Sequence, residues 1–153
     1  MPQKININGR EVLTAIYKTP VQNRIRMRKL NLEGDGQADL TVHGGEHQAV
    51  YSYPFEHYSY WQQVLKKPEL AMGTFGENLT VSGLLETEVY VGDILQIGEG
   101  ADAAVVQITM PRIPCFKFGH KVGRPDILDE FLLSGRSGFY QRVLTEGEIG
   151  AGD

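Results

Sequence analysis

Residues 104–117 read Ala-Val-Val-Gln-Ile-Thr-Met-Pro-Arg-Ile-Pro-Cys-Phe-Lys, a strand-like run that leads into the only cysteine of the chain. The β-branched residues of Ala104–Thr109 predict a strand. Pro111 and Pro114 bracket the residues that follow, and because proline fixes φ they predict a rigid, extended loop over 111–117. The segment therefore predicts that Cys115 lies just beyond the end of a strand.

Cys115 lies between two cations, Arg112 three residues before it and Lys117 two residues after it. Nearby cations favour the thiolate, which is both the nucleophile and the soft metal ligand. The alternative is a buried, inert cysteine. A papain-like pair of Cys115 with a histidine also stays open, with the four candidates His43, His47, His57 and His120, although no local motif supports it. One cysteine excludes an internal disulfide and any zinc site with two or more thiolates.

Short runs rich in β-branched or aromatic residues recur between Gly and Asp turns, which predicts several strands. Besides Ala104–Thr109, the predicted strands are Val12–Tyr17, Arg24–Leu30, Asn78–Val81, Ile94–Ile97 and Phe139–Leu144. Two helices are predicted, one from Pro54 to Leu65 and one at Asp126–Leu133, because apolar residues recur there at intervals of three or four after a proline. The last residues predict a turn and the approach to a further strand that is not completed. We therefore expect a mainly β, barrel-like fold with a few short helices.

The composition is that of one globular domain, with 153 residues of which 41% are hydrophobic and 22% charged. Acidic residues outnumber basic ones by 19 to 15, and the net charge of −4 argues against a protein that grips nucleic acid. No apolar run approaches the roughly 18 residues of a membrane-spanning helix, and no secretory leader is visible. We expect a cytoplasmic domain without nucleic-acid or membrane partners.

Basic residues are nevertheless concentrated in two segments, 24–29 and 111–142. In the first, Arg24, Arg26 and Arg28 alternate, so a strand would place them on one face. These residues form either a solvated face or, together with the second segment, a cationic surface that converges on one anionic ligand.

Turns supply a second group of candidates. Gly44 and Gly45 follow His43, and successive glycine N–H groups can line a concavity suited to phosphate. Asn78, within Phe75-Gly-Glu-Asn-Leu79, carries two donor hydrogens and an acceptor that can fix a heterocycle or a phosphate edge. Taken alone, an ordinary turn is the stronger interpretation for each of these residues.

In their order along the chain, these segments resemble the MOSC domain, the C-terminal domain of molybdenum cofactor sulfurases, and more closely its bacterial hydroxylaminopurine-resistance (YiiM-like) branch. The similar segments are Gly34-Asp-Gly-Gln-Ala-Asp39, Val42-His-Gly-Gly45, Tyr53-Pro54, Trp61, Gly73-Thr-Phe-Gly-Glu-Asn-Leu79, Val91-Gly-Asp93, Pro111-Arg-Ile-Pro-Cys115 and Gly138-Phe-Tyr-Gln-Arg-Val143. The resemblance implies that residues 1–153 form a single MOSC domain, with a β-barrel of the pyruvate-kinase-barrel type.

The resemblance also implies a molybdenum cofactor (molybdopterin), with Cys115 as catalytic residue and thiolate ligand to molybdenum. It implies that the cofactor is bound by residues around this thiol, namely His43, Gly44, Gly45, Asn78, Arg112, Lys117, Tyr140 and Arg142. The implied activity is that of a molybdenum-dependent oxidoreductase, which reduces N-hydroxylated compounds such as hydroxylaminopurine or amidoximes with electrons from a partner reductase. Asp35, Asp39 and His43 are candidates for proton relay, although a turn or structural role is the stronger interpretation for the two aspartates.

Two other functions are compatible with the same residues. In the first, Cys115 carries a persulfide received from a pyridoxal-phosphate cysteine desulfurase, because MOSC domains also occur fused to such enzymes. In the second, the domain stores or delivers the molybdenum cofactor without catalysis. Members of this branch commonly continue into a C-terminal helical region after the equivalent of Asp153, which this sequence lacks and which we expect to matter for docking of the electron partner.

Overall fold

The computed structural model describes residues 2–38 and 44–153, and its regular structure is mainly β, as predicted. The strands are β1 (Gln3–Ile7), β2 (Arg10–Thr14), β3 (Ile25–Met27), β4 (Val50–Pro54), β5 (Leu79–Val81), β6 (Ile94–Ile97), β7 (Ala104–Pro111), β8 (Phe139–Thr145) and β9 (Gly147–Ile149). The helices are α1 (Tyr58–Leu65), α2 (Phe116–Val122) and α3 (Ile127–Leu133), with short 3-10 helices η1 (Glu46–Gln48), η2 (Phe55–His57) and η3 (Gly100–Asp102).

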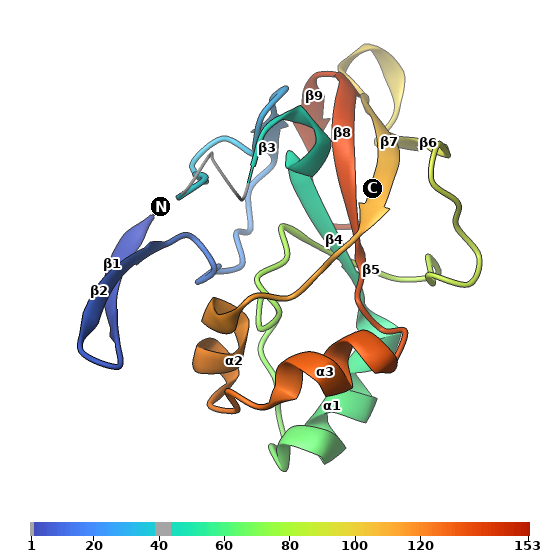
Figure 1. Cartoon of the computed structure of the whole chain (residues 1–153). Coiled ribbons are helices and arrows are strands. Elements are labelled where there is room, and N and C mark those ends of the chain that lie inside the picture. Colours follow the sequence, from blue (N-terminus) through green and yellow to red (C-terminus); the bar gives the residue numbers. More distant parts are fainter. Residues whose placement is uncertain (1, 39–43) are drawn as a thin grey trace.

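The centre of the fold is a five-stranded sheet in the order β5-β4-β8-β7-β6. β4 and β5 pair in parallel, and the other neighbours pair antiparallel. The register of β7 on β8 shifts between Val105 and Val106 and again between Ile108 and Met110. Such bulges bend a strand and increase its twist, so the sheet curls as a barrel-like fold requires (Figure 1).

Two further strand pairs flank this sheet. β1 and β2 form an antiparallel hairpin that stands out from the body of the molecule (Figure 1), and β3 pairs antiparallel with β9. β9 completes a strand where the sequence predicted only the approach to one. A Cβ atom on Gly147 would lie 2.4 Å from the Asp102 carbonyl oxygen, so this close approach of two backbones requires glycine at the start of β9.

The three helices gather at one end of the sheet (Figure 1). α1 and α3 lie within the two predicted helical segments, whereas α2 was not predicted. α2 ends at Gly123, which has a φ of 78° and closes the helix in the left-handed conformation. Lys117 therefore lies in the first turn of a helix, and the predicted extended loop ends at Cys115. No helix of the described residues is long and apolar enough to span a membrane.

The interior is divided into two cores. The aliphatic core lies on the sheet and consists of Met27, Leu32, Ala49, Val50, Ala104, Val106, Val143 and Ile149. The aromatic core lies at the helical end and consists of Tyr51, Tyr53, Tyr58, Trp61, Leu65, Phe75, Phe118, Val122, Ile127 and Phe131. β7 begins in the aliphatic core and α2 packs in the aromatic core, so residues 112–115 cross from one core to the other. This crossing carries Cys115.

Candidate functional site

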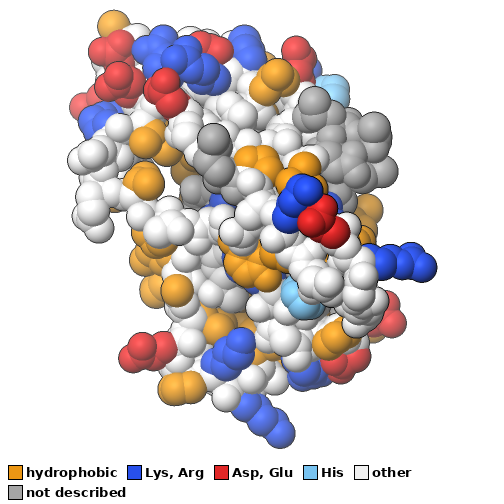
Figure 2. Space-filling model, turned by 90° about the vertical axis from the view of Figure 1, so that its left-hand side faces the viewer, with side chains coloured by type: hydrophobic (Ala, Val, Ile, Leu, Met, Phe, Trp, Pro, Cys, Tyr) orange, Lys and Arg blue, Asp and Glu red, His pale blue; other side chains and the backbone are white. Residues whose placement is uncertain are grey.

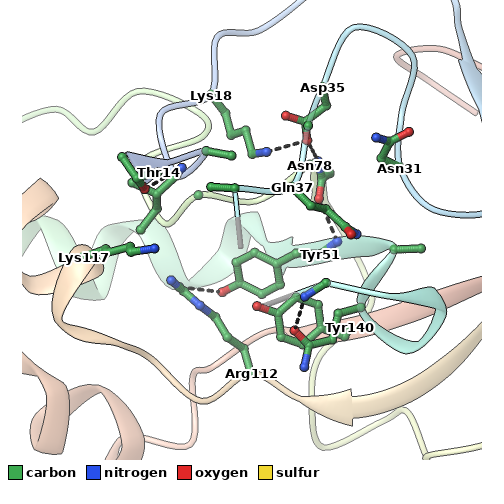
Figure 3. A pocket seen from close by; sticks show the side chains of 18 of the residues that line it. Thr14, Lys18, Asn31, Asp35, Gln37, Tyr51, Asn78, Arg112, Lys117 and Tyr140 are labelled. Atoms are coloured by element: carbon green, nitrogen blue, oxygen red, sulfur yellow. Dashed lines mark hydrogen bonds and ion pairs between the residues drawn. The ribbon is translucent and has the colours of Figure 1, made fainter. Parts of the chain in front are cut away.

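A pocket brings the β7–α2 link, β4 and the segment after β2 together around Cys115 (Figure 3). It is lined by Thr14, Ala15, Ile16, Lys18, Asn31, Asp35, Gly36, Gln37, Ala38, Gly44, Gln48, Ala49, Tyr51, Gly76, Asn78, Arg112, Ile113, Cys115, Lys117 and Tyr140. The structure thus brings together the predicted residues Gly44, Asn78, Arg112, Cys115, Lys117 and Tyr140, which are far apart in the sequence.

Three predicted residues stand apart from this group. Arg142 does not line the pocket, and its Nε atom donates a hydrogen bond to the Gln107 side chain over 2.8 Å. Gly45 lies just outside the lining, where its N–H donates to Gln37 Oε1 over 3.1 Å. His43 lies outside the described residues, as does the relay candidate Asp39.

Arg112 is the most deeply held cation of the pocket, with 5% of its surface exposed. Its Nη1 atom donates to the Phe75 carbonyl oxygen over 2.8 Å and to the Tyr51 hydroxyl over 3.2 Å. The guanidinium also lies over the rings of Tyr51 and Phe118, at 4.8 and 5.0 Å from their centroids. Cation–π contacts and two hydrogen bonds therefore hold this buried charge in one position.

Lys117 is also buried, with 8% of its surface exposed, and its amine is directed into the pocket (Figure 3). Within the described residues, no hydrogen bond or ion pair is made by its Nζ atom. The ammonium therefore faces the pocket without a counter-charge among the described residues, and an anionic group at this position would be bound favourably.

Cys115 is a free thiol that is partly exposed on the wall of the pocket. It has extended backbone angles, with φ −119° and ψ 169°, and its carbonyl oxygen accepts the Phe118 N–H over 2.9 Å. The interpretation as a fully buried, inert cysteine does not describe this position. Among the described histidines, none lines the pocket, so no papain-like pair forms with them.

The opposite side of the pocket comes from the N-terminal segment and is a chain of polar contacts. Lys18 Nζ forms an ion pair with Asp35 Oδ2, and Asn78 Nδ2 donates to the same oxygen over 2.6 Å. Asn78 Oδ1 accepts the Tyr51 N–H over 3.0 Å. These contacts orient the Asn78 amide and use its acceptor and one donor hydrogen, which leaves one N–H for a ligand. Lys18 was missed from the sequence, since no local motif distinguishes it.

Among the described residues, the lining side chains carry three cations, Lys18, Arg112 and Lys117, and one carboxylate, Asp35. Lys121, on α2, does not line the pocket. Its Nζ atom donates to the Gly73 carbonyl and, over 2.8 Å, to the Ile16 carbonyl. Burial lowers the pKa of Lys121 to about 8; the charge of Glu77 opposes this shift, and the charges of Arg112 and Lys18 add to it. The pocket therefore has a positive field that favours an anionic ligand.

Two tyrosines complete the floor of the pocket. Burial raises the pKa of Tyr51 and of Tyr140, against the opposing effect of the Arg112 charge. Both phenols therefore keep their protons at neutral pH, which makes them hydrogen-bond donors. The Tyr51 hydroxyl uses its proton within the protein, on the Ser137 carbonyl oxygen at 2.7 Å.

The arginines of segment 24–29 do not converge on this pocket. Arg24 forms an ion pair with Asp153 and Arg28 one with Glu33. On the face of the molecule in Figure 2, Lys and Arg side chains are interspersed with Asp and Glu. Of the two interpretations, the solvated face is the one that the structure supports.

Within the described ranges, no group of three or more His, Cys, Asp or Glu residues is placed to hold a metal ion.

Several known proteins have sequences similar to that of this chain. The chain is 43% identical over 151 residues to the uncharacterized protein YflK of Bacillus subtilis, which covers 99% of this chain and 66% of that protein. It is 39% identical over 140 residues to the protein YiiM of Escherichia coli, covering 90% of this chain and 61% of YiiM. A protein of Gibberella moniliformis named "Reductase" is 33% identical over 147 residues, or 95% of this chain and 26% of that protein. The chain thus spans less than two thirds of the length of each of these relatives.

The fold has a close counterpart among solved structures. The crystal structure of YiiM from Geobacillus stearothermophilus superposes with a TM-score of 0.74 and 37% sequence identity, covering 97% of this chain and 67% of that one. The family model of the MOSC domain matches residues 39–153, which include Cys115, Arg112 and Lys117. The chain therefore belongs to the MOSC domain family, and its relatives include proteins of the YiiM-like branch.

Proposed function

We propose that the pocket binds a molybdenum cofactor of the molybdopterin type, and that the loaded protein reduces N-hydroxylated compounds. The observation that carries this proposal is Lys117, whose side chain is largely buried while its ammonium faces the pocket that Cys115 also lines, without a partner among the described residues. An anionic ligand would supply the missing counter-charge. A soft metal on that ligand would find the thiolate that it prefers.

The chemistry of the donor set fits such a group. Lys117 and Arg112 would bind its phosphate, and Asn78 would offer one amide N–H to a heterocycle edge. Gly44 on the pocket wall allows a ligand to approach the backbone closely because it has no side chain. Cys115 is exposed enough to bind a metal on that ligand. Each of these side chains lines the same pocket.

Reduction of an N-hydroxyl group consumes two electrons and two protons, breaks the N–O bond and releases water with the amine or amidine. When bound, the molybdenum cofactor supplies the two-electron chemistry, with electrons from a partner reductase. The chain's own residues fix the thiolate of Cys115, neutralise anionic charge with Arg112 and Lys117, and keep a protonated phenol, Tyr140, on the pocket wall. The relative named "Reductase" supports a reductive activity for this family branch.

The test uses protein purified from a host that makes molybdopterin. We expect pterin and molybdenum in the wild-type protein and turnover of hydroxylaminopurine with a chemical reductant. Lys117→Gln should retain at least tenfold less pterin, because one charge-assisted contact contributes about 1.5–3 kcal/mol. Arg142→Gln is the matched control and should load normally, since Arg142 lies outside the pocket lining. Equal loading of both variants would contradict the proposed site.

The same preparation separates the two alternative functions. A persulfide on Cys115, detected by mass spectrometry in protein without pterin, would replace the proposal by a sulfur carrier served by a pyridoxal-phosphate cysteine desulfurase. Bound cofactor without turnover of any N-hydroxylated compound would instead indicate a protein that stores or delivers the cofactor.

A further inference from the structure

The turn Arg136–Gly138, just before β8, supports the floor of the pocket through its backbone. Its three carbonyl oxygens accept hydrogen bonds from three groups outside the turn, and the Gly138 oxygen also accepts the Ser137 hydroxyl over 3.0 Å. The Arg136 oxygen accepts the Tyr53 hydroxyl over 3.0 Å, and the Ser137 oxygen accepts the Tyr51 hydroxyl over 2.7 Å. The Gly138 oxygen accepts the Arg112 N–H over 3.2 Å. Tyr51 and Arg112 line the pocket, whereas the turn itself does not.

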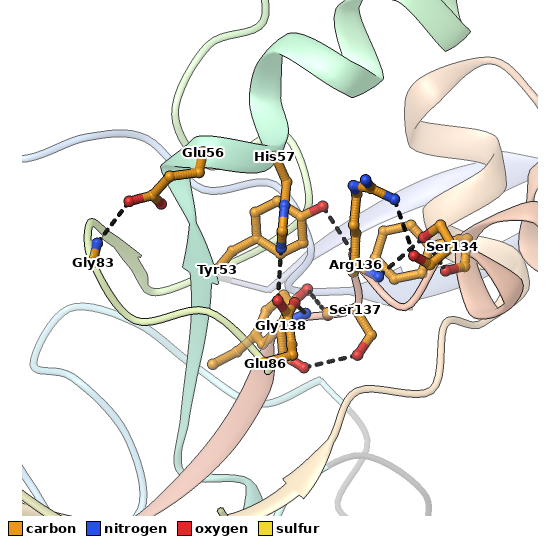
Figure 4. A network of polar contacts seen from close by, with 11 residues as sticks. Tyr53, Glu56, His57, Gly83, Glu86, Ser134, Arg136, Ser137 and Gly138 are labelled. Atoms are coloured by element: carbon orange, nitrogen blue, oxygen red, sulfur yellow. Dashed lines mark hydrogen bonds and ion pairs between the residues drawn. The ribbon is translucent and has the colours of Figure 1, made fainter. Parts of the chain in front are cut away.

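The other side of this turn is held by one carboxylate (Figure 4). Glu86 Oε1 accepts the Gly138 N–H over 2.6 Å, and Glu86 Oε2 lies 2.6 Å from His57 Nε2. Burial opposes ionisation of Glu86, but the hydrogen bonds from His57 and from the Gly138 N–H outweigh it and lower the pKa of the carboxyl. The bond to the turn is therefore a charge-assisted one at neutral pH.

The turn has little freedom to adjust by itself. Gly138 has a φ of 66°, and a Cβ atom there would lie 2.5 Å from the Ser52 carbonyl oxygen on β4. The turn is thus pressed against the sheet on one side. The carboxylate of Glu86 fixes the peptide plane of Gly138 on the other.

We infer that Glu86 is a positioning residue for the pocket, which sets the location of the Arg112 guanidinium through the turn Arg136–Gly138. Two routes connect them. One is the backbone bond from the Arg112 N–H to Gly138, and the other runs through Tyr51, whose hydroxyl donates to the turn and accepts from Arg112 Nη1. This inference concerns how the cation is held and is independent of which anion the pocket binds.

Amide hydrogen exchange, measured by NMR on the intact chain, tests the inference without a ligand. In Glu86→Ala we expect the amide of Arg112 to exchange at least tenfold faster than in the wild type, while the amide of Val106 in the aliphatic core keeps its rate. Glu86→Gln should stay close to the wild type, because its side-chain oxygen still accepts the Gly138 N–H. This rescue separates positioning from a general loss of stability.

A second carboxylate provides the matched control. Glu56 Oε1 accepts the Gly83 N–H over 2.7 Å. Gly83 and Glu86 lie in the same loop, between β5 and β6, so Glu56 anchors this loop at a point away from the turn Arg136–Gly138. Glu56→Ala should leave Arg112 exchange unchanged. An unchanged Arg112 rate in Glu86→Ala, or an equal acceleration of Arg112 and Val106, would overturn the inference.

Inorganic pyrophosphate is the probe for the effect on the pocket. We expect Glu86→Ala to bind it about tenfold more weakly and Glu86→Gln to bind it as the wild type does. If the wild type binds no pyrophosphate, the anion site of the proposed function fails, and the exchange rates of Arg112 still decide the role of Glu86.

Discussion

The pocket has two walls that are held by different forces. The inner wall (Tyr51, Arg112, Cys115, Lys117 and Tyr140) comes from β4, β8, the β7–α2 link and the first turn of α2. The outer wall (Thr14, Lys18, Asn31, Asp35 and Gln37) comes from the N-terminal segment, and all of it precedes the family match at residues 39–153. Arg112 is 5% exposed, whereas the Lys18 and Asp35 side chains that pair on the outer wall are 18% and 16% exposed.

The two walls should differ in how well they tolerate substitutions. The inner wall is continuous with the aromatic core, so its side chains are fixed by packing, stacking and buried hydrogen bonds. The outer wall is tied to it by a few polar contacts, chiefly from Asp35 to Asn78. We therefore expect substitutions on the inner side to affect folding and binding together, and substitutions on the outer side to tune binding with little effect on folding.

The largest contrast is expected between two glycine substitutions. Gly138→Ala places a Cβ atom 2.5 Å from the Ser52 carbonyl at a φ of 66°, and it should lower the free energy of unfolding by about 3 kcal/mol or more. Gly36→Ala on the outer side meets the side-chain ring of Pro2 at 2.7 Å and no backbone oxygen of the sheet, and Gly36 has no positive φ, so the loss should be smaller, about 1–2 kcal/mol. Urea denaturation measures both, and similar losses would remove the distinction between the walls.

The next contrast replaces one cation on each wall. Arg112→Leu leaves the buried Phe75 carbonyl and Tyr51 hydroxyl without their donor, at a cost of about 1–3 kcal/mol of stability. Lys18→Met breaks an ion pair that is nearer to solvent and should cost about 1 kcal/mol or less. Thermal and urea denaturation of the two variants compare these losses. A larger effect at Lys18 would contradict the assignment of the rigid wall.

Lys121 connects the two walls, since its amine donates to the Ile16 and Gly73 carbonyls, and it gives the protein a pH dependence. Its folded pKa of about 8 lies below its usual 10.5, so between these values the unfolded chain binds more protons. The free energy of unfolding should therefore rise with pH over this window, by roughly 1–2 kcal/mol after allowance for solvent screening. The neutral amine still has two hydrogens for the two carbonyls.

Denaturation of the wild type and Lys121→Met at pH 7.5 and pH 10 isolates this contribution. The gain in stability on raising the pH should be greater in the wild type than in the variant. An equal pH response in the two proteins would show that the pKa of Lys121 is not lowered.

The smallest expected effect is an increase in affinity. Asp35→Asn removes the carboxylate that the described residues contribute to the pocket lining and frees Lys18, while an amide oxygen remains to accept from Asn78. We expect pyrophosphate to bind a few-fold more tightly, with stability changed by less than about 1 kcal/mol. Isothermal titration at low and moderate salt measures this, and weaker binding would mean that Asp35 contacts the ligand directly.

Local patterns predicted the parts of the fold that depend on local sequence. Ile94–Ile97 forms β6 as predicted, and Ala104–Thr109 lies within β7. β4 was missed because Val50-Tyr-Ser-Tyr-Pro54 is buried along its whole length and shows no alternation. Its polar residue Ser52 is satisfied by the Gln141 side chain at 2.7 Å, a partner far away in the sequence. α2 was missed because Gly119 weakens the helical signal and is selected by close packing against the Arg124 carbonyl, 3.0 Å from the position of a Cβ atom.

In the site, too, the residues that a local pattern marks were predicted, and those that only the fold brings together were missed. Arg112, Cys115 and Lys117 were found because they lie within six residues of one another. Lys18 was missed because only the fold brings the N-terminal segment against β4 and the β7–α2 link. Arg142 was included because the family resemblance, which covers Gly138–Val143, implied it, but it does not line the pocket.

The central claim is that Cys115 binds molybdenum in this pocket, and the metal content of one variant tests it most directly. The molybdenum-to-polypeptide ratio is measured for the wild type and Cys115→Ser, both purified from a molybdopterin-producing host. We expect molybdenum in the wild type and its loss in Cys115→Ser, with folding unchanged because the thiol is partly exposed. A ratio in Cys115→Ser equal to that of the wild type would contradict it.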